Sequence, residues 1–155
     1  MLRFEALCVP RAMVVAAIDL GTRRIGLAVS DSEGRVVSPL AVVERRSLSA
    51  DIEAVHRMLS ARQVDRVIVG LPLNMDGGEG RMAILARNFA NRLAEHTGIA
   101  VELQDERLSS FEARERVAEL GGRRRGRKKR PLDALAAAVI LETWFEKKRR
   151  ALPRS

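Results

Sequence analysis

Cysteine, aromatic residues and long apolar runs are scarce in this chain of 155 residues. The single cysteine, Cys8, cannot form an internal disulfide, and with only His56 and His96 beside it the chain lacks the ligands of a zinc site. Aromatic residues make up 3% of the chain, which disfavours an aromatic platform for stacking bases. No apolar run approaches the roughly 20 residues that span a bilayer. We therefore expect a cytoplasmic protein that makes no membrane contact.

Basic residues are in excess. The chain has 28 Lys and Arg against 20 Asp and Glu, a net charge of +8, and 46% of its residues are hydrophobic, which is enough for a core. A polyanionic partner would suit this charge, but the charge alone fits a basic protein without such a partner equally well. The placement of the charges has to decide between the two.

The length is that of one domain. We predict an N-terminal extension over residues 1–13, one domain over residues 14–150 and a C-terminal tail over residues 151–155.

Five strands and four helices are expected in the order βββαβαβαα. The predicted strands, each an apolar or alternating run, cover residues 14–19, 24–30, 36–43, 66–70 and 99–104. The predicted helices, each with apolar residues three and four apart, begin at Ser49, Arg81, Ser109 and Pro131. This order predicts an α/β protein with a mixed five-stranded sheet, an antiparallel meander continued by parallel crossover units, and helices on both faces.

Local signals refine these elements. Pro39 predicts an irregular or edge position in the third strand. Ser49 is expected to cap the first helix, and Ser109 with Glu112 to form a capping box. The inner face of the second helix is expected to carry Met82, Leu85, Phe89 and Leu93.

Three acids stand out by position. Asp19 ends the first strand, Glu106 follows the fifth strand, and Asp133 lies in the first turn of the last helix. Sites in open α/β sheets form beyond the carboxyl ends of the strands, so these carboxylates could converge there. Converging carboxylates repel one another unless a cation neutralises them, and an all-oxygen ligand set favours Mg²⁺ or Mn²⁺. Two such ions could promote phosphodiester hydrolysis.

Each acid also has an ordinary structural explanation. Asp133 suits the positive end of a helix dipole, Asp19 could cap the turn at Gly21, and Glu106 could belong to an exposed turn paired with Arg107. Spacing alone does not show that the three meet.

Two segments could bind phosphate. A basic run precedes Asp133 and comprises Arg123, Arg124, Arg125, Arg127, Lys128, Lys129 and Arg130. Its position favours contacts to a nucleic-acid backbone over a merely solvated loop. The loop over residues 70–80 is rich in glycine and leads into a helix N-terminus; it fits either a phosphate-binding loop or a plain connector.

Four stretches of the chain resemble motifs of the YqgF family of RuvC-like nucleases, in the family's order. They cover residues 17–31, 69–77, 105–109 and 132–137. The resemblance implies an RNase H-like fold and a catalytic, metal-binding site of Asp19, Glu106 and Asp133. It also makes the motif residues Thr22, Arg23, Asn74 and Arg107 candidates for nucleic-acid binding. RuvC-like resolvases use four acids, so Asp105 and Asp31 are candidates for a fourth ligand; the alternative is one weakly held ion.

The family resemblance implies processing of the 5′ end of pre-16S ribosomal RNA. Cleavage of branched DNA, as by a Holliday junction resolvase, is the alternative substrate; two symmetric cuts would require a homodimer, whereas RNA cleavage allows a monomer. A non-catalytic nucleic-acid-binding factor is a further alternative. An actin-like or sugar-kinase-like ATPase would need two such domains, and this chain has the length of one.

Overall fold

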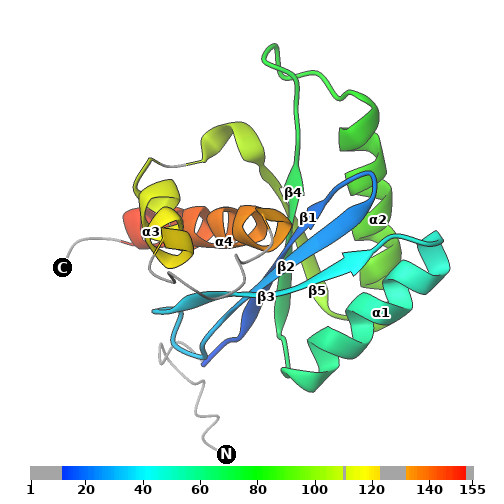
Figure 1. Cartoon of the computed structure of the whole chain (residues 1–155), viewed down its shortest axis with the longest axis horizontal. Coiled ribbons are helices and arrows are strands. Elements are labelled where there is room, and N and C mark those ends of the chain that lie inside the picture. The colour runs from blue at the N-terminus through cyan, green and yellow to red at the C-terminus, as the bar shows by residue number, and fades with distance from the viewer. Residues whose placement is uncertain (1–11, 110, 123–131, 153–155) are drawn as a thin grey trace, which may run out of the picture.

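A mixed five-stranded sheet forms the centre of the molecule, and it matches the architecture predicted from the sequence (Figure 1). The computed structural model describes residues 12–109, 111–122 and 132–152. The strands are β1 (Val15–Leu20), β2 (Arg24–Ser30), β3 (Val37–Glu44), β4 (Arg66–Leu71) and β5 (Ala100–Asp105). The helices are α1 (Leu48–Ala61), α2 (Arg81–Thr97), α3 (Phe111–Gly122) and α4 (Leu132–Ala151), with a short 3₁₀ helix, η1 (Glu106–Leu108), after β5.

The strand order is β3-β2-β1-β4-β5. The pairs β1–β2 and β2–β3 are antiparallel, whereas β1–β4 and β4–β5 are parallel. The carboxyl ends of β1, β4 and β5 therefore lie at the same edge of the sheet. Asp19 and Glu106 lie at this edge, because Asp19 is near the end of β1 and Glu106 directly follows β5.

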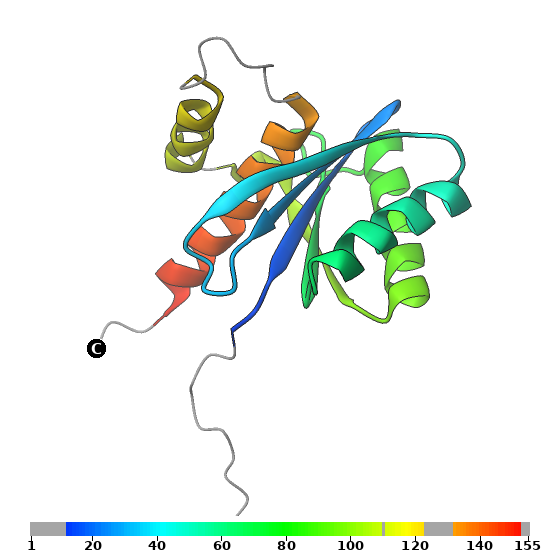
Figure 2. The same ribbon diagram turned by 60° about the horizontal axis from the view of Figure 1, so that its bottom comes forward.

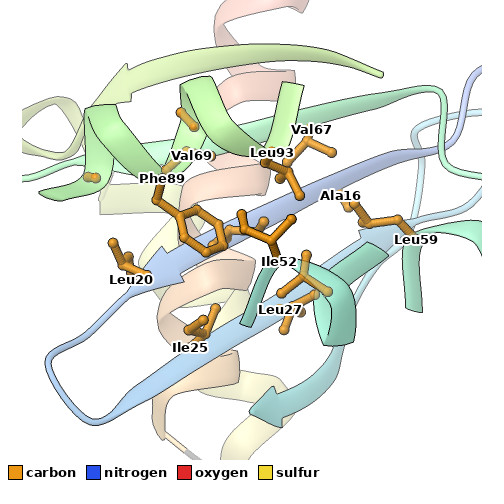
Figure 3. Close-up of a cluster of buried hydrophobic side chains, with 14 of the residues drawn as sticks. Ala16, Leu20, Ile25, Leu27, Ile52, Leu59, Val67, Val69, Phe89 and Leu93 are labelled. Atoms are coloured by element: carbon orange, nitrogen blue, oxygen red, sulfur yellow. The ribbon is translucent and has the colours of Figure 1, made fainter. Parts of the chain in front are cut away.

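Helices cover both faces of the sheet, as predicted. On one face, α1 and α2 pack against β1, β2 and β4 through a large apolar cluster (Figure 3). Phe89 and Leu93 of α2 are fully buried there, next to Val69 of β4. On the other face, α4 crosses the sheet and α3 lies beside α4 (Figure 2). The apolar cluster on this face is smaller and includes Ala137, Ala138 and Leu141, whose packing brings α4 close to the strands.

The helix caps differ from those expected. Helix α1 is capped by Ser47, whose hydroxyl accepts a hydrogen bond from the Ala50 amide, so the prediction of Ser49 was wrong. The expected capping box at Ser109 is also wrong: the Ser109 hydroxyl donates to the Glu106 carbonyl at 2.7 Å and closes η1 instead. At α1 two serines adjoin the helix start, and only the local backbone selects Ser47.

The buried face of α2 is shifted from the predicted one. Phe89 and Leu93 are buried as expected, but Met82 and Leu85 are only half-buried. The remaining buried positions are Ala83, Ala86 and Ala90. Alanine contributes little to an apolar pattern, yet its small side chain lets the helix pack closely on the sheet.

Pro39 lies at an irregularity of the edge strand β3, as predicted. The register between β2 and β3 shifts between Leu27 and Ala28, which pair with Ala41 and Pro39. No helix among the described residues is long and apolar enough to cross a membrane.

Candidate active site

The Asp19 and Glu106 side chains approach each other across the end of β4. Asp19 lies near the end of β1 and Glu106 directly follows β5, so the two strands flank β4. Gly70 on β4 leaves the space between them open: a Cβ there would lie 2.3 Å from Glu106 Oε1. The glycine thus makes room for the Glu106 carboxyl group.

The two carboxyl groups interact directly. Partial burial, the negative charge of Asp19 and a hydrogen bond between the two side chains together raise the pKa of Glu106 to about 7, with burial the largest cause. Burial and the charge of Asp133 also raise the pKa of Asp19, while its hydrogen bond to Glu106 opposes this rise. Neighbouring carboxylates that are withdrawn from water hold a proton more tightly, because a second negative charge is costly there.

Asp133 enters the site from the opposite side. Helix α4 starts over β2, and a Cβ on Gly26 would lie 1.9 Å from the Asp133 carbonyl oxygen. Gly26 pairs with Asp19 in the β1–β2 register, so this close packing places Asp133 near Asp19. The Asp133 carboxylate accepts a hydrogen bond from Nε of Arg24 through Oδ2, at 2.9 Å.

A cavity of about 240 Å³ opens beside the acids. Its polar lining includes Asp19, Glu106, Ser109 and the α3 residue Arg114. The apolar floor is formed by Ala136, Val139 and Ile140 of α4. The arrangement places the neighbouring carboxyl groups of Asp19 and Glu106 and the guanidinium of Arg114 around a partly apolar space. Such a space suits an anionic ester that lies next to a bound cation.

The donor set of this site fits a divalent metal ion in its chemistry. Asp19 and Glu106 offer oxygen ligands and their mutual repulsion would be relieved by a cation. Over residues 12–109, 111–122 and 132–152, however, no three His, Cys, Asp or Glu side chains lie together in a metal-binding arrangement. Asp133 completes the set only if its carboxylate leaves Arg24 or is shared with it.

The two candidates for a fourth acid lie in other interactions. Asp105 pairs with Arg107, whose Nη2 lies 2.7 Å from Asp105 Oδ2, and this pairing lowers the pKa of Asp105. The Asp31 carboxylate accepts the backbone amides of Arg35 and Val36 in the turn after β2, at the far end of that strand from Arg24. Asp31 therefore lies away from the site, whereas Asp105 borders it.

The residues expected to bind nucleic acid fall into three groups. Thr22 and Arg23 are exposed in the turn that follows Asp19. Arg107 contacts the loop that contains Asn74: its Nη1 donates to the carbonyls of Asn74 and Met75, each at 3.4 Å. The basic run over residues 123–130 lies outside the described residues.

Sequence reasoning missed two arginines at this site, Arg24 and Arg114. Both are basic residues close to a predicted acid or its cavity. Arg24 is separated from Asp133 by 109 residues, so nothing in the local sequence indicates the pairing. The glycines at 26 and 70 carried a usable signal, since a glycine within a strand often marks the close approach of another group.

The strand order, the helices on both faces and the acids at the carboxyl edge define an RNase H-like fold. A comparison with solved structures agrees: RuvC of T. thermophilus in complex with a Holliday junction substrate aligns with a TM-score of 0.67 at 20% identity, covering 92% of this chain and 98% of RuvC. At this identity the likeness shows the fold alone.

The family follows from the sequence comparisons. The model of the RuvX family, described as Holliday junction resolvase, matches residues 13–147, so the chain belongs to this family. A protein of Anaeromyxobacter sp. (strain Fw109-5), named "Putative pre-16S rRNA nuclease", is 50% identical over 129 residues, which are 83% of this chain and 93% of that protein. A protein of Pasteurella multocida (strain Pm70) with the same name is 43% identical over 86% of this chain and 95% of its own length.

Proposed function

We propose that this protein is a divalent-metal-dependent nuclease that hydrolyses phosphodiester bonds in the cytoplasm, with Asp19, Glu106 and Asp133 as its catalytic, metal-binding acids. The observation that carries the proposal is the contact between the Asp19 and Glu106 carboxyl groups beside a cavity. Membership of the RuvX family supports the same activity. The ion is Mg²⁺ or Mn²⁺, because the ligands are oxygens.

Each residue of the site has a distinct task in this proposal. Asp19 and Glu106 would hold the ion between the ends of β1 and β5, and Asp133 would bind it from α4. A bound divalent ion supplies Lewis-acid stabilisation of the phosphoryl oxygens and activates a water molecule. Arg114 lines the cavity and is placed to contact a phosphate oxygen. The apolar side chains of Val139 and Ile140, which line the cavity, would limit the access of bulk water to the acids.

We propose the 5′ leader of pre-16S ribosomal RNA as the substrate. Relatives that are 42–50% identical to this chain carry the name of a pre-16S rRNA nuclease. Thr22, Arg23, Asn74, Arg107 and the basic run over residues 123–130 would bind the RNA backbone. Backbone contacts of this kind position a substrate without reading its sequence. RNA cleavage requires only a monomer.

A DNA junction is the second candidate, because the family model carries the description of a Holliday junction resolvase. Paired cuts in a junction with two-fold symmetry would require a homodimer. The two candidates therefore differ both in substrate and in oligomeric state.

The decisive experiment offers the wild-type protein Mn²⁺ or Mg²⁺ with two labelled substrates, a pre-16S 5′-leader RNA and a four-way DNA junction. Asp19→Asn should abolish cleavage, because it removes one ligand charge while it preserves the side-chain size. Glu95→Gln is the matched control, since Glu95 is exposed on α2 on the opposite face of the sheet. Equal cleavage by wild-type and Asp19→Asn proteins would overturn the proposal. Salt-sensitive RNA binding without cleavage would indicate a non-catalytic binding factor.

A further inference from the structure

Arg24 occupies the carboxylate that the proposed metal site needs. Its Nε lies 2.9 Å from Asp133 Oδ2, and this is a charged hydrogen bond between β2 and the first turn of α4. The Asp133 side chain is 29% exposed and the Arg24 side chain 59% exposed, so the pair lies at the surface rather than in the core. The pair can therefore open without unfolding the protein.

The three acids of the site do not have equal surroundings. Asp19 and Glu106 share a hydrogen bond with each other, whereas the Asp133 carboxylate is bonded to a cation. The described residues accordingly contain no group of three acids in a metal-binding arrangement. The Asp133 carboxylate is bonded to the Arg24 guanidinium, not to either of the other two acids, in the hydrogen bonds of the described residues.

We propose that Arg24 is a built-in counter-ion that competes with the metal ion for Asp133. The inference rests on the proposed metal-dependent function and goes beyond it by assigning a role to a residue outside the acid set. A cation that binds Asp133 must displace the Arg24 guanidinium or lie beside it, and two cations next to each other repel. Metal binding and the Arg24–Asp133 pair therefore oppose each other.

The displaced guanidinium would be well placed for substrate. Arg24 directly follows Thr22 and Arg23 at the end of β1 and the start of β2, next to the acids. A guanidinium released from a carboxylate can bind a phosphate oxygen with the same geometry. Arg24 would thus exchange one oxygen anion for another as the site fills. Without metal, the ion pair with Arg24 keeps the charge of Asp133 balanced.

The test measures the dissociation constant of Mn²⁺ by isothermal titration calorimetry on the full chain, without substrate. Arg24→Gln should bind Mn²⁺ more tightly than Arg23→Gln by about 1.5- to fivefold, the range that a surface ion pair contributes. Arg23→Gln is the matched control, since it removes the same charge one residue away, and no ion pair of the Arg23 side chain is seen in the described structure. Arg24→Lys should lie between wild type and Arg24→Gln.

A second pair of proteins shows whether Asp133 carries the effect. In an Asp133→Asn background, Arg24→Gln and Arg23→Gln should bind Mn²⁺ equally. Equal affinities in the wild-type background, or weaker binding by Arg24→Gln, would overturn the inference. If wild-type protein binds Mn²⁺ and cleaves substrate while Arg24→Gln changes nothing, only this inference fails. If no protein binds Mn²⁺, the inference and the metal-dependent function fail together.

Discussion

Gly26 of β2 lies directly beneath the backbone of Asp133, so closely that a Cβ on the glycine would lie 1.9 Å from the Asp133 carbonyl oxygen. Gly26→Ala must therefore displace the first turn of α4. We expect a loss of about 1–3 kcal/mol in the free energy of unfolding and a large loss of cleavage, because Asp133 moves with the backbone. Urea unfolding and a cleavage assay measure the two effects. Gly80→Ala is the control, since a Cβ on Gly80 would lie 3.4 Å from its nearest neighbour, Asn74 Oδ1. Equal stability and equal cleavage for the two variants would contradict the prediction.

Gly70→Ala should separate activity from stability. A Cβ at this position would meet Glu106 Oε1 at 2.3 Å and Ile140 Cδ1 at 2.6 Å, which are the ends of flexible side chains rather than backbone. We expect the Glu106 carboxyl group to move and cleavage to fall at least about tenfold, because a misplacement of about 1 Å in a reacting geometry can cost about 100-fold. The cost in stability should be smaller than for Gly26→Ala, about 1 kcal/mol. A variant with full activity would show that Glu106 is not positioned by this contact.

The pKa of Glu106 predicts how stability depends on pH in metal-free protein. Its folded-state pKa of about 7 lies above the ordinary value of 4.5 for a glutamate, so the folded state binds more protons than the unfolded state between these values. Stability should therefore fall as pH rises from about 4.5 to 7. Glu106→Gln should remove much of this fall and raise the Tm at pH 8 by about 2–4 °C if the charge costs about 1 kcal/mol. Thermal unfolding at pH 5 and pH 8 in EDTA checks this.

A wild-type Tm that does not change between pH 5 and pH 8 would contradict the raised pKa of Glu106. Glu95→Gln is again the control, because this side chain is exposed on the other face of the sheet. Added Mn²⁺ should reverse the sign of the Glu106→Gln effect, because the metal stabilises the charged form of its ligand.

The sequence predicted the sheet well because its signals are local. The second strand was predicted at residues 24–30, where β2 lies, since an apolar run between two turns indicates a strand wherever it pairs. The approach of Asp19 and Glu106 follows from the rule that parallel strands end at one edge. The Arg24–Asp133 pair could not be predicted, because it depends on how α4 is docked over β2. The choice between Ser47 and Ser49 as cap depended on backbone geometry in the same way.

Arg107 should order the loop between β4 and α2. It is fixed by Asp105 and donates to the carbonyls of Asn74 and Met75, in a turn where Gly77 has a φ of 88°. We expect Arg107→Ala to speed the amide hydrogen exchange of Gly77 by about tenfold, a loss of about 1.4 kcal/mol of local protection. Arg92→Ala, an exposed α2 arginine, is the control. Unchanged exchange would leave Arg107 with no role in ordering the loop.

Asp51 should be the most sensitive acid for stability outside the site. Its side chain is 2% exposed and accepts hydrogen bonds from Nε of Arg45 and from the Arg46 amide. Arg45 Nη1 also donates to the carbonyl of Gly21, in the turn that follows Asp19, so the pair ties the start of α1 to the end of β1. Asp51→Ala leaves the largely buried Arg45 without its charged partner and should cost about 3–5 kcal/mol. Asp51→Asn retains an acceptor oxygen and should cost clearly less, so equal unfolding midpoints for the two variants in urea would show that the hydrogen bonds to this oxygen contribute nothing.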